Sequence, residues 1–322
     1  MTELKQHHVV ANGIRQHITE AGTGPVVLFC HGFPELGFSW RHQLQTLAVA
    51  GYRAIAPDMR GYGATDAPTD SSQYSILHLV GDMVGLLGEL GIAQATIVGH
   101  DWGAPVAWTA AQLRPDLFHS VVGMSVPFAP RGPYSALEAA RRAGRDNYYQ
   151  LYFQRPGVAE RDFDKDRTAA IRRMMWTLSG GPAKPWPGLI GAEGALDAFH
   201  EPERPMAWIS DAELSVYYTA FEATGFTGAM NWYRNLERNW ELGAAFQGLA
   251  IKQPAWFITG AKDPIYPLFK PLVEALPHTV PGHLGTTVIA QAGHWVQQEA
   301  AEQVNQALLA FLELAKRHQL HA

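Results

Sequence analysis

Short apolar runs alternate with longer amphipathic stretches along most of this chain. Six of the runs are continuously apolar over most of their length, and we expect them to be strands: Pro25–Cys30, Arg53–Pro57, Ala95–Gly99, Ser120–Met124, Ala255–Thr259 and Thr286–Ala290. Strands buried on both faces of a parallel sheet have this continuous pattern, whereas half-exposed strands alternate between polar and apolar residues. The pattern therefore predicts a mostly parallel sheet.

Helical patterns lie between these runs. The expected helices are Trp40–Ala50, Ile76–Leu90, Trp102–Leu113 and Ala301–Lys316. Ser39 is expected to cap the first of them, because serine is a favoured N-cap residue. This strand and helix order predicts an α/β fold of the doubly wound type, with helices on both faces of the sheet. Before it, Asn12-Gly13 between apolar residues predicts a β-hairpin with a type I′ turn.

The alternation stops between about residue 129 and residue 245 and then resumes. This stretch has helical and aromatic segments, and ten of the 26 residues in 180–205 are Gly or Pro, which is typical of a loop. A solvated linker is the ordinary interpretation of such a stretch. Because two further strands follow it, we interpret it as an insertion. We predict a core domain of residues 1–130 and 246–322 and a helical cap, or lid, of residues 131–245.

Composition narrows the classes of protein to consider. The chain has 322 residues, a length that fits two domains or one large α/β domain with an insertion. Its 47% apolar residues exclude intrinsic disorder. Lys and Arg number 25 against 30 Asp and Glu, so no nucleic-acid partner is expected. One cysteine and no Cys–His spacing of the zinc type predict neither a disulfide framework nor a metal site.

The location of the protein is also constrained by the absence of long apolar stretches. The chain opens with polar residues, and no apolar run approaches the ~20 residues of a membrane span. We therefore expect a soluble, cytoplasmic protein without membrane insertion.

The most distinctive motif is Gly99-His100-Asp101-Trp102-Gly103, between an expected strand and an expected helix. It has the form of the G-x-S-x-G nucleophile elbow, with Asp101 in place of the serine. The glycines allow the tight turn, and the positive end of the following helix favours a carboxylate there. Alternatively, Asp101 is only the N-cap of that helix.

An aspartate nucleophile predicts a particular reaction. A carboxylate that attacks a saturated carbon bearing a leaving group forms an ordinary ester, which water can then hydrolyse. The expected substrate is therefore an alkylating agent, either an epoxide or an alkyl halide.

The remaining catalytic groups are expected in the chain order nucleophile, acid, histidine. His294 lies between the last expected strand and the last helix, in the place of the general base. Asp263 follows the preceding strand in the place of the orienting acid, although an Asp before Pro is usually a turn former. The orienting acid sometimes follows the strand that here ends at Met124, but residues 125–128 contain no carboxylate.

An oxyanion hole is expected after the first buried strand, in His31-Gly32-Phe33-Pro34. The backbone N–H groups of Phe33 and Trp102 would point at the ester carbonyl of Asp101, where such donors stabilise developing charge. A plain strand-terminating turn is the alternative interpretation of this segment.

Taken together, these segments resemble the α/β-hydrolase-fold epoxide hydrolases, most of all the bacterial relatives of the soluble epoxide hydrolase. The matching segments span nearly the whole chain and fade at 180–205; they are residues 31–35, 39–41, 58–63, 99–103, 149–154, 156–160, 231–235 and 293–295. The resemblance implies that Tyr149 and Tyr233 of the cap donate hydrogen bonds to the epoxide oxygen, as acid catalysis of ring opening requires. Core packing is the alternative role for a tyrosine.

The resemblance also implies the partners of the site. An apolar pocket for a small apolar epoxide and water is expected, lined by Phe33, Trp102, Phe153 and Trp232. No cofactor is implied, and a monomer and a homodimer are both compatible with the sequence.

Two other functions, dehalogenation and ligand binding without catalysis, are possible on the same fold. Haloalkane dehalogenases usually have a halide-binding Asn after the His-Gly pair, where this chain has Phe33. Fluoroacetate-type haloacid dehalogenases have arginines that bind the substrate carboxylate, where this chain has Trp102 and Pro105. A catalytically silent binding protein would lack at least one catalytic group, and none is missing. The sequence thus favours an epoxide hydrolase that forms a vicinal diol through a covalent aspartyl ester.

Overall fold

One eight-stranded sheet forms the centre of the computed structural model, which describes residues 3–319. In chain order its strands are β1 (Lys5–Ala11), β2 (Ile14–Ala21), β3 (Val26–Cys30), β4 (Arg53–Pro57), β5 (Ala95–His100), β6 (Phe118–Met124), β7 (Ala255–Gly260) and β8 (His283–Ile289). The spatial order is β1-β2-β4-β3-β5-β6-β7-β8. Strands β4 to β8 of this order are parallel, and β2 pairs antiparallel with both β1 and β4.

The N-terminal hairpin has the predicted turn. Asn12 and Gly13 join β1 to β2 with φ angles of 50° and 77°, both in the left-handed region that a type I′ turn requires. The predicted hairpin is therefore confirmed.

Helices cover both faces of the sheet, as the order of elements predicts. The helices that pack on it are α1 (Arg41–Val49), α2 (Ile76–Glu89), α3 (Gly103–Leu113), α11 (Tyr266–Thr279) and α13 (Ala301–Gln319). One buried cluster contains Leu44 of α1 and Val304 of α13. A second, larger cluster contains side chains of α2, α3 and α11 on the opposite face, including Leu79, Val106 and Val273. The α/β prediction is confirmed.

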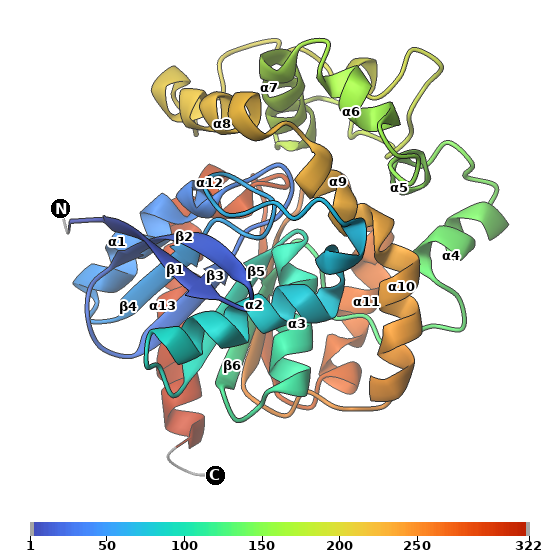
Figure 1. Cartoon of the computed structure of the whole chain (residues 1–322). Helices are drawn as coiled ribbons and strands as arrows, with labels where there is room; N and C mark the ends of the chain where they lie inside the picture. The colour runs from blue at the N-terminus through green and yellow to red at the C-terminus, as the bar shows by residue number, and fades with distance from the viewer. Residues whose placement is uncertain (1–2, 320–322) are drawn as a thin grey trace.

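The segment between β6 and β7 forms a helical layer over one edge of the sheet (Figure 1). Its helices are α4 (Ala136–Arg142), α5 (Tyr149–Tyr152), α6 (Val158–Phe163), α7 (Arg167–Leu178), α8 (Asp211–Thr224), α9 (Thr227–Arg234) and α10 (Leu236–Leu242). Residues 180–205 form a long loop with one short 3₁₀ helix, Leu196–Ala198. The loop is not merely solvated, because Trp186 and Phe199 are buried in it.

Two expectations about local structure were wrong. Ser39 does not cap α1: it lies inside a 3₁₀ helix, Gly37–Trp40, and its hydroxyl contacts the Tyr217 hydroxyl at 2.8 Å. Strand β8 is not buried on both faces. It is an edge strand of the sheet, and Val288 is 44% exposed. Its short apolar run resembles that of a central strand, so the pattern alone could not separate the two.

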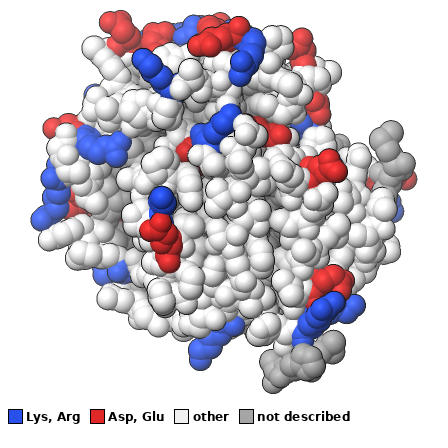
Figure 2. Space-filling view, turned by 180° about the vertical axis from the view of Figure 1, so that it is seen from behind, with Lys and Arg blue, Asp and Glu red and all other residues white. Residues whose placement is uncertain are grey.

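On the face shown in Figure 2, the charged side chains form small separate groups, and in many of them Lys or Arg lies beside Asp or Glu. Within residues 3–319, no helix has the length and apolar character needed to cross a bilayer.

Candidate functional site

The loops after four parallel strands meet below the helical layer. Phe33 follows β3, Asp101 follows β5, Asp263 follows β7 and His294 follows β8. In parallel sheets the carboxyl ends of the strands lie at one edge, where α/β proteins commonly form their binding crevices. Residues up to 261 positions apart in the sequence are thereby brought together.

The turn that carries Asp101 is strained in the way that an elbow requires. Its φ angle is 51°, a left-handed value that only a few per cent of non-glycine residues adopt. A Cβ atom at Gly99 would collide with the Gly103 carbonyl, and one at Gly103 would collide with the Cys30 carbonyl. Trp102 is the N-cap of α3, with no side-chain cap, so the alternative interpretation of Asp101 as a cap is wrong.

His294 lies between two carboxylates. Its Nδ1 is 3.0 Å from Asp263 Oδ2, and its Nε2 is 3.6 Å from Asp101 Oδ2. His294 and Asp263 are buried, at 3% and 1% exposure. The structure therefore brings together all three residues of the expected nucleophile, acid and base.

The two oxygens of Asp101 have different surroundings. The Phe33 amide donates a hydrogen bond of 2.8 Å to Oδ1, whereas Oδ2 faces His294. Among the described residues, the amide of Trp102, the second expected donor, makes no hydrogen bond to this carboxylate. One oxygen is thus held by a backbone donor, and the other is left on the side of the histidine.

Burial and charge shift the pKa values of these groups in opposite directions. Burial alone would raise the pKa of Asp101, but the hydrogen bond and charge of His294 outweigh it and lower this pKa. Burial likewise disfavours protonated His294, yet the charges of Asp263 and Asp101 raise its pKa well above the usual value. The two shifts together favour an ionised Asp101 beside a protonated His294.

Tyr149 of α5 and Tyr233 of α9 lie together opposite Asp101, with ring centroids 5.9 Å apart. The side chain of Gln154 joins their helices, since it donates to the backbone carbonyls of Gln150 (2.8 Å) and Tyr233 (2.9 Å). Burial, together with the negative charge of Asp101, raises both tyrosine pKa values well above 10. Both phenols therefore keep their protons and can donate hydrogen bonds.

A small cavity of about 30 Å³ lies between the tyrosines and the Asp101 carboxylate. Its wall is mostly apolar and consists of Phe33, Asp101, Tyr149, Phe153, Met174, Leu178, Trp186, Phe199, Tyr233, Ile265 and His294. The expected lining residues Phe33 and Phe153 are among them.

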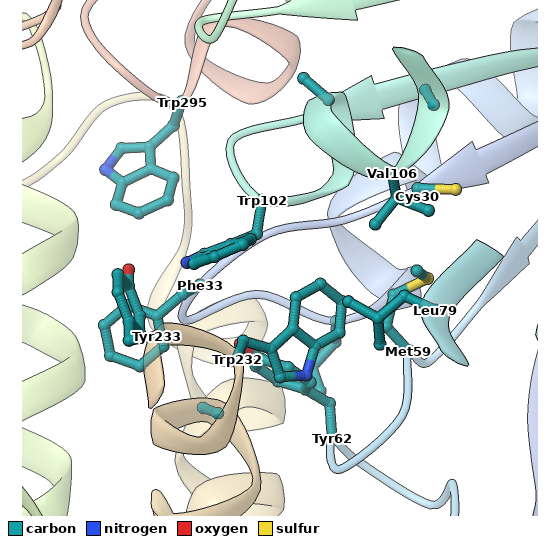
Figure 3. Close-up of a cluster of buried hydrophobic side chains, with 14 of the residues drawn as sticks. Cys30, Phe33, Met59, Tyr62, Leu79, Trp102, Val106, Trp232, Tyr233 and Trp295 are labelled. Carbon is teal, nitrogen blue, oxygen red and sulfur yellow. The ribbon is translucent and has the colours of Figure 1, made fainter. Parts of the chain in front are cut away.

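Trp102 and Trp232 differ from the expectation, since neither is among the described residues of the cavity wall. The Trp232 indole donates to the Arg60 carbonyl at 3.0 Å and packs edge-on against Tyr62. The Trp102 ring lies edge-on to Tyr233. Figure 3 shows both indoles in a cluster of buried hydrophobic side chains that includes Phe33, Tyr62 and Tyr233.

Several neighbours of the site were not identified from the sequence. Ser125 donates to Asp263 Oδ2 at 2.6 Å and lies 3.1 Å from His294 Nδ1. It occupies the position after β6 that was considered only for a carboxylate, so its place in the order of strands was a usable signal. Met174, Leu178, Trp186, Phe199 and Ile265 carry no such signal, because long-range packing alone brings them to the cavity.

A second buried histidine supports the backbone of the first. His100 Nε2 is 2.8 Å from the His294 carbonyl, and its Nδ1 is 2.6 Å from Glu35 Oε2. Gln297 and Gln298 donate to the other oxygen of Glu35. A buried network of hydrogen bonds therefore underlies the loop that holds His294.

Comparison with known proteins agrees with this architecture. Residues 25–183 match the α/β hydrolase fold family. The chain is 43% identical over 310 residues to epoxide hydrolase A of Mycobacterium tuberculosis. The aligned region covers 94% of this chain and 96% of that protein. It is 41% identical over 318 residues to epoxide hydrolase 3 of Siraitia grosvenorii, covering 97% of this chain and 99% of that one.

Solved structures give the same relationship. An epoxide hydrolase from an endophytic Streptomyces superposes with a TM-score of 0.92 at 41% identity, covering 96% of this chain and 95% of that one. Epoxide hydrolase A from Mycobacterium thermoresistibile gives 0.91 at 42% identity, with 97% and 98% covered. This chain belongs to the epoxide hydrolase family of the α/β-hydrolase fold.

Proposed function

We propose that this protein hydrolyses a small apolar epoxide to a vicinal diol through a covalent ester on Asp101. The observation that carries this proposal is the unequal setting of the two Asp101 oxygens: Oδ1 is bound by the Phe33 amide, while Oδ2 is open toward His294 and the cavity. The names of the relatives, all epoxide hydrolases, support the choice of substrate.

In the first half-reaction, Oδ2 attacks an epoxide carbon and the carbon–oxygen bond of the ring breaks. The bonding pair moves to the epoxide oxygen, which takes a proton from Tyr149 or Tyr233 while the other phenol donates a hydrogen bond. Positioned acids of this kind contribute about 10²–10⁴ in rate. Burial is the main cause of the raised tyrosine pKa values and persists, but negative charge leaves Asp101 in the same step, so its contribution to them disappears as the proton is needed.

Formation of the ester prepares His294 for the second half-reaction. Asp101 is now neutral, and His294 loses one of the two carboxylates that raise its pKa. Its proton can therefore return to the tyrosinate, which leaves a neutral imidazole whose orientation is fixed by Asp263 and Ser125.

In the second half-reaction, His294 removes a proton from water and the resulting hydroxide attacks Cγ of the ester. The oxyanion develops on Oδ1, where the Phe33 amide already lies at 2.8 Å. One such donor is worth about 10²–10³ in rate. The intermediate releases the diol oxygen, which takes the proton from His294. The acid that remains on Asp101 returns its own proton to the imidazole.

The arrangement of the chain suits this reaction. We propose that residues 131–245 act as a cap on the core domain, 1–130 and 246–322. In this division the cap supplies the two tyrosines and most of the apolar wall, and the core supplies the nucleophile, acid and base. Enclosure of the site excludes bulk water, which would otherwise solvate the carboxylate and weaken its attack.

A panel of aryl and alkyl epoxides and alkyl halides tests the proposal, with diol formation and halide release measured in parallel and Asp101→Ala as the inactive control. We expect diol from epoxides and no comparable halide release. Halide release without diol formation would instead make the protein a dehalogenase.

A further inference from the structure

Glu299, the last residue of α12 (Val296–Glu299), takes no part in the reaction described above, yet it contacts the loop that carries His294. Its Oε1 accepts the Trp295 amide at 3.0 Å, and its Oε2 accepts the Gly293 amide at 3.0 Å. These donors are the residues immediately before and after His294. The same Oε2 accepts the Gly180 amide at 2.8 Å.

The third donor belongs to the helical layer, just beyond the end of α7. Two further bonds join these parts of the chain: the His294 amide donates to the Leu178 carbonyl at 2.9 Å, and the Trp295 indole donates to the Met175 carbonyl at 2.8 Å. A Cβ atom at Gly293 would collide with the backbone of the residues after Leu178. The end of α7 is therefore packed directly on the histidine loop.

Leu178 also lines the cavity, so this contact lies between the substrate wall and the base. Hydrogen bonds from amides to a carboxylate are about twice as strong as neutral ones, and one side chain makes three of them here. The distance from His294 Nε2 to Asp101 Oδ2 is 3.6 Å, longer than a hydrogen bond of good geometry. Because the loop carries His294, its position determines how closely the imidazole approaches Asp101.

We infer that Glu299 is a positioning residue: its carboxylate fixes the His294 loop to the end of α7 and thereby aims the imidazole at the ester formed on Asp101. The inference rests on the proposed function, because it concerns the half-reaction that needs His294. A misplacement of about 1 Å can cost about 10²-fold in rate, whereas attack by Asp101 on the epoxide needs no base.

The test is Glu299→Gln, which keeps the size of the side chain but turns an N–H₂ group toward a backbone N–H. Glu302→Gln, on the exposed side of α13, is the matched control. Rapid quenching and intact-protein mass spectrometry give the rates of ester formation and ester hydrolysis separately. We expect ester formation to change less than about twofold and hydrolysis to fall about 10- to 100-fold, so that the ester accumulates.

Equal losses in both half-reactions, or unchanged hydrolysis, would overturn the inference. Glu299→Asp provides the decision if the glutamine variant does not fold, because it keeps the charge but is too short to reach all three amides; it should show the same selective loss. His294→Gln in the same assay separates the two hypotheses. If that variant forms no ester, the proposed function fails. If it does, while Glu299→Gln hydrolyses at the normal rate, only the positioning role of Glu299 fails.

Discussion

Removal of the two phenolic hydroxyls should abolish ring opening without disturbing the fold. Tyr149→Phe and Tyr233→Phe keep the aromatic rings, so the packing of Tyr233 against Phe33, Phe153 and Trp102 is retained. The hydroxyls have few side-chain partners: Gln150 donates to the Tyr149 hydroxyl at 3.2 Å, Tyr148 also interacts with Tyr149, and Trp102 interacts with the Tyr233 hydroxyl. We therefore expect a stability loss of no more than about 1 kcal/mol.

The effect on the rate follows from the geometry of the pair. The rings are 5.9 Å apart and face the same carboxylate, so both hydroxyls can reach one epoxide oxygen. Each single variant leaves one donor, and we expect ring opening to slow about 10²-fold, or about 2.7 kcal/mol. The double variant leaves none. Since the two residues share one oxygen, its loss should exceed the product of the single losses.

Single-turnover measurement of ester formation, with diol release as the second readout, gives the four rates of this double-mutant cycle. A double variant with full activity on epoxides would refute the tyrosine assignment and would make a dehalogenase the better reading of the site. Strictly additive effects would mean that the hydroxyls act on different atoms.

Three further predictions concern other parts of the chain. Asp101→Ala should abolish turnover of every substrate while circular dichroism shows a native fold; activity near the normal level would mean that another group attacks. Ser125→Ala should slow ester hydrolysis more than ester formation, because the hydroxyl bonds Asp263 and lies beside His294; an equal effect on both steps would contradict this. The Asp58 carboxylate, through its hydrogen bond and charge, raises the pKa of His17, so this contact should stabilise the fold at low pH and weaken as pH rises through that pKa. His17→Gln should therefore lower Tm more at about pH 6 than at about pH 9, and an equal shift at both would refute the linkage.

The sequence predicted the parts of the site that depend on local turns. Asp101 was identified because the two glycines around it mark a turn whose backbone is too crowded for a Cβ atom. His294 and Asp263 were identified because each follows a strand, and parallel strands bring their ends to one edge. Chain order and turn chemistry are short-range information, and they sufficed for these residues.

The parts that the sequence did not predict depend on packing between distant segments. An apolar ring such as that of Trp232 suits both a cavity wall and a buried core. Its hydrogen bond to the Arg60 carbonyl shows that it lies in the core. Glu299 contacts Gly180 across 119 residues, so no spacing in the sequence reveals the pair. Serine is a favoured N-cap residue, but the Ser39 hydroxyl instead makes a long-range hydrogen bond with the Tyr217 hydroxyl.

The central claim is that Asp101 forms a covalent ester with the substrate, and His294→Gln tests it most directly. Ester formation needs no base, because the nucleophile is itself a carboxylate, and the Phe33 amide, which also lowers the pKa of Asp101, is still present in the variant; hydrolysis does need a base. On mixing with an epoxide, the variant should gain the mass of the whole epoxide, once per chain, and peptide mapping should place it on Asp101. Diol formation by an unmodified variant would contradict the account, since water would then open the epoxide in one step.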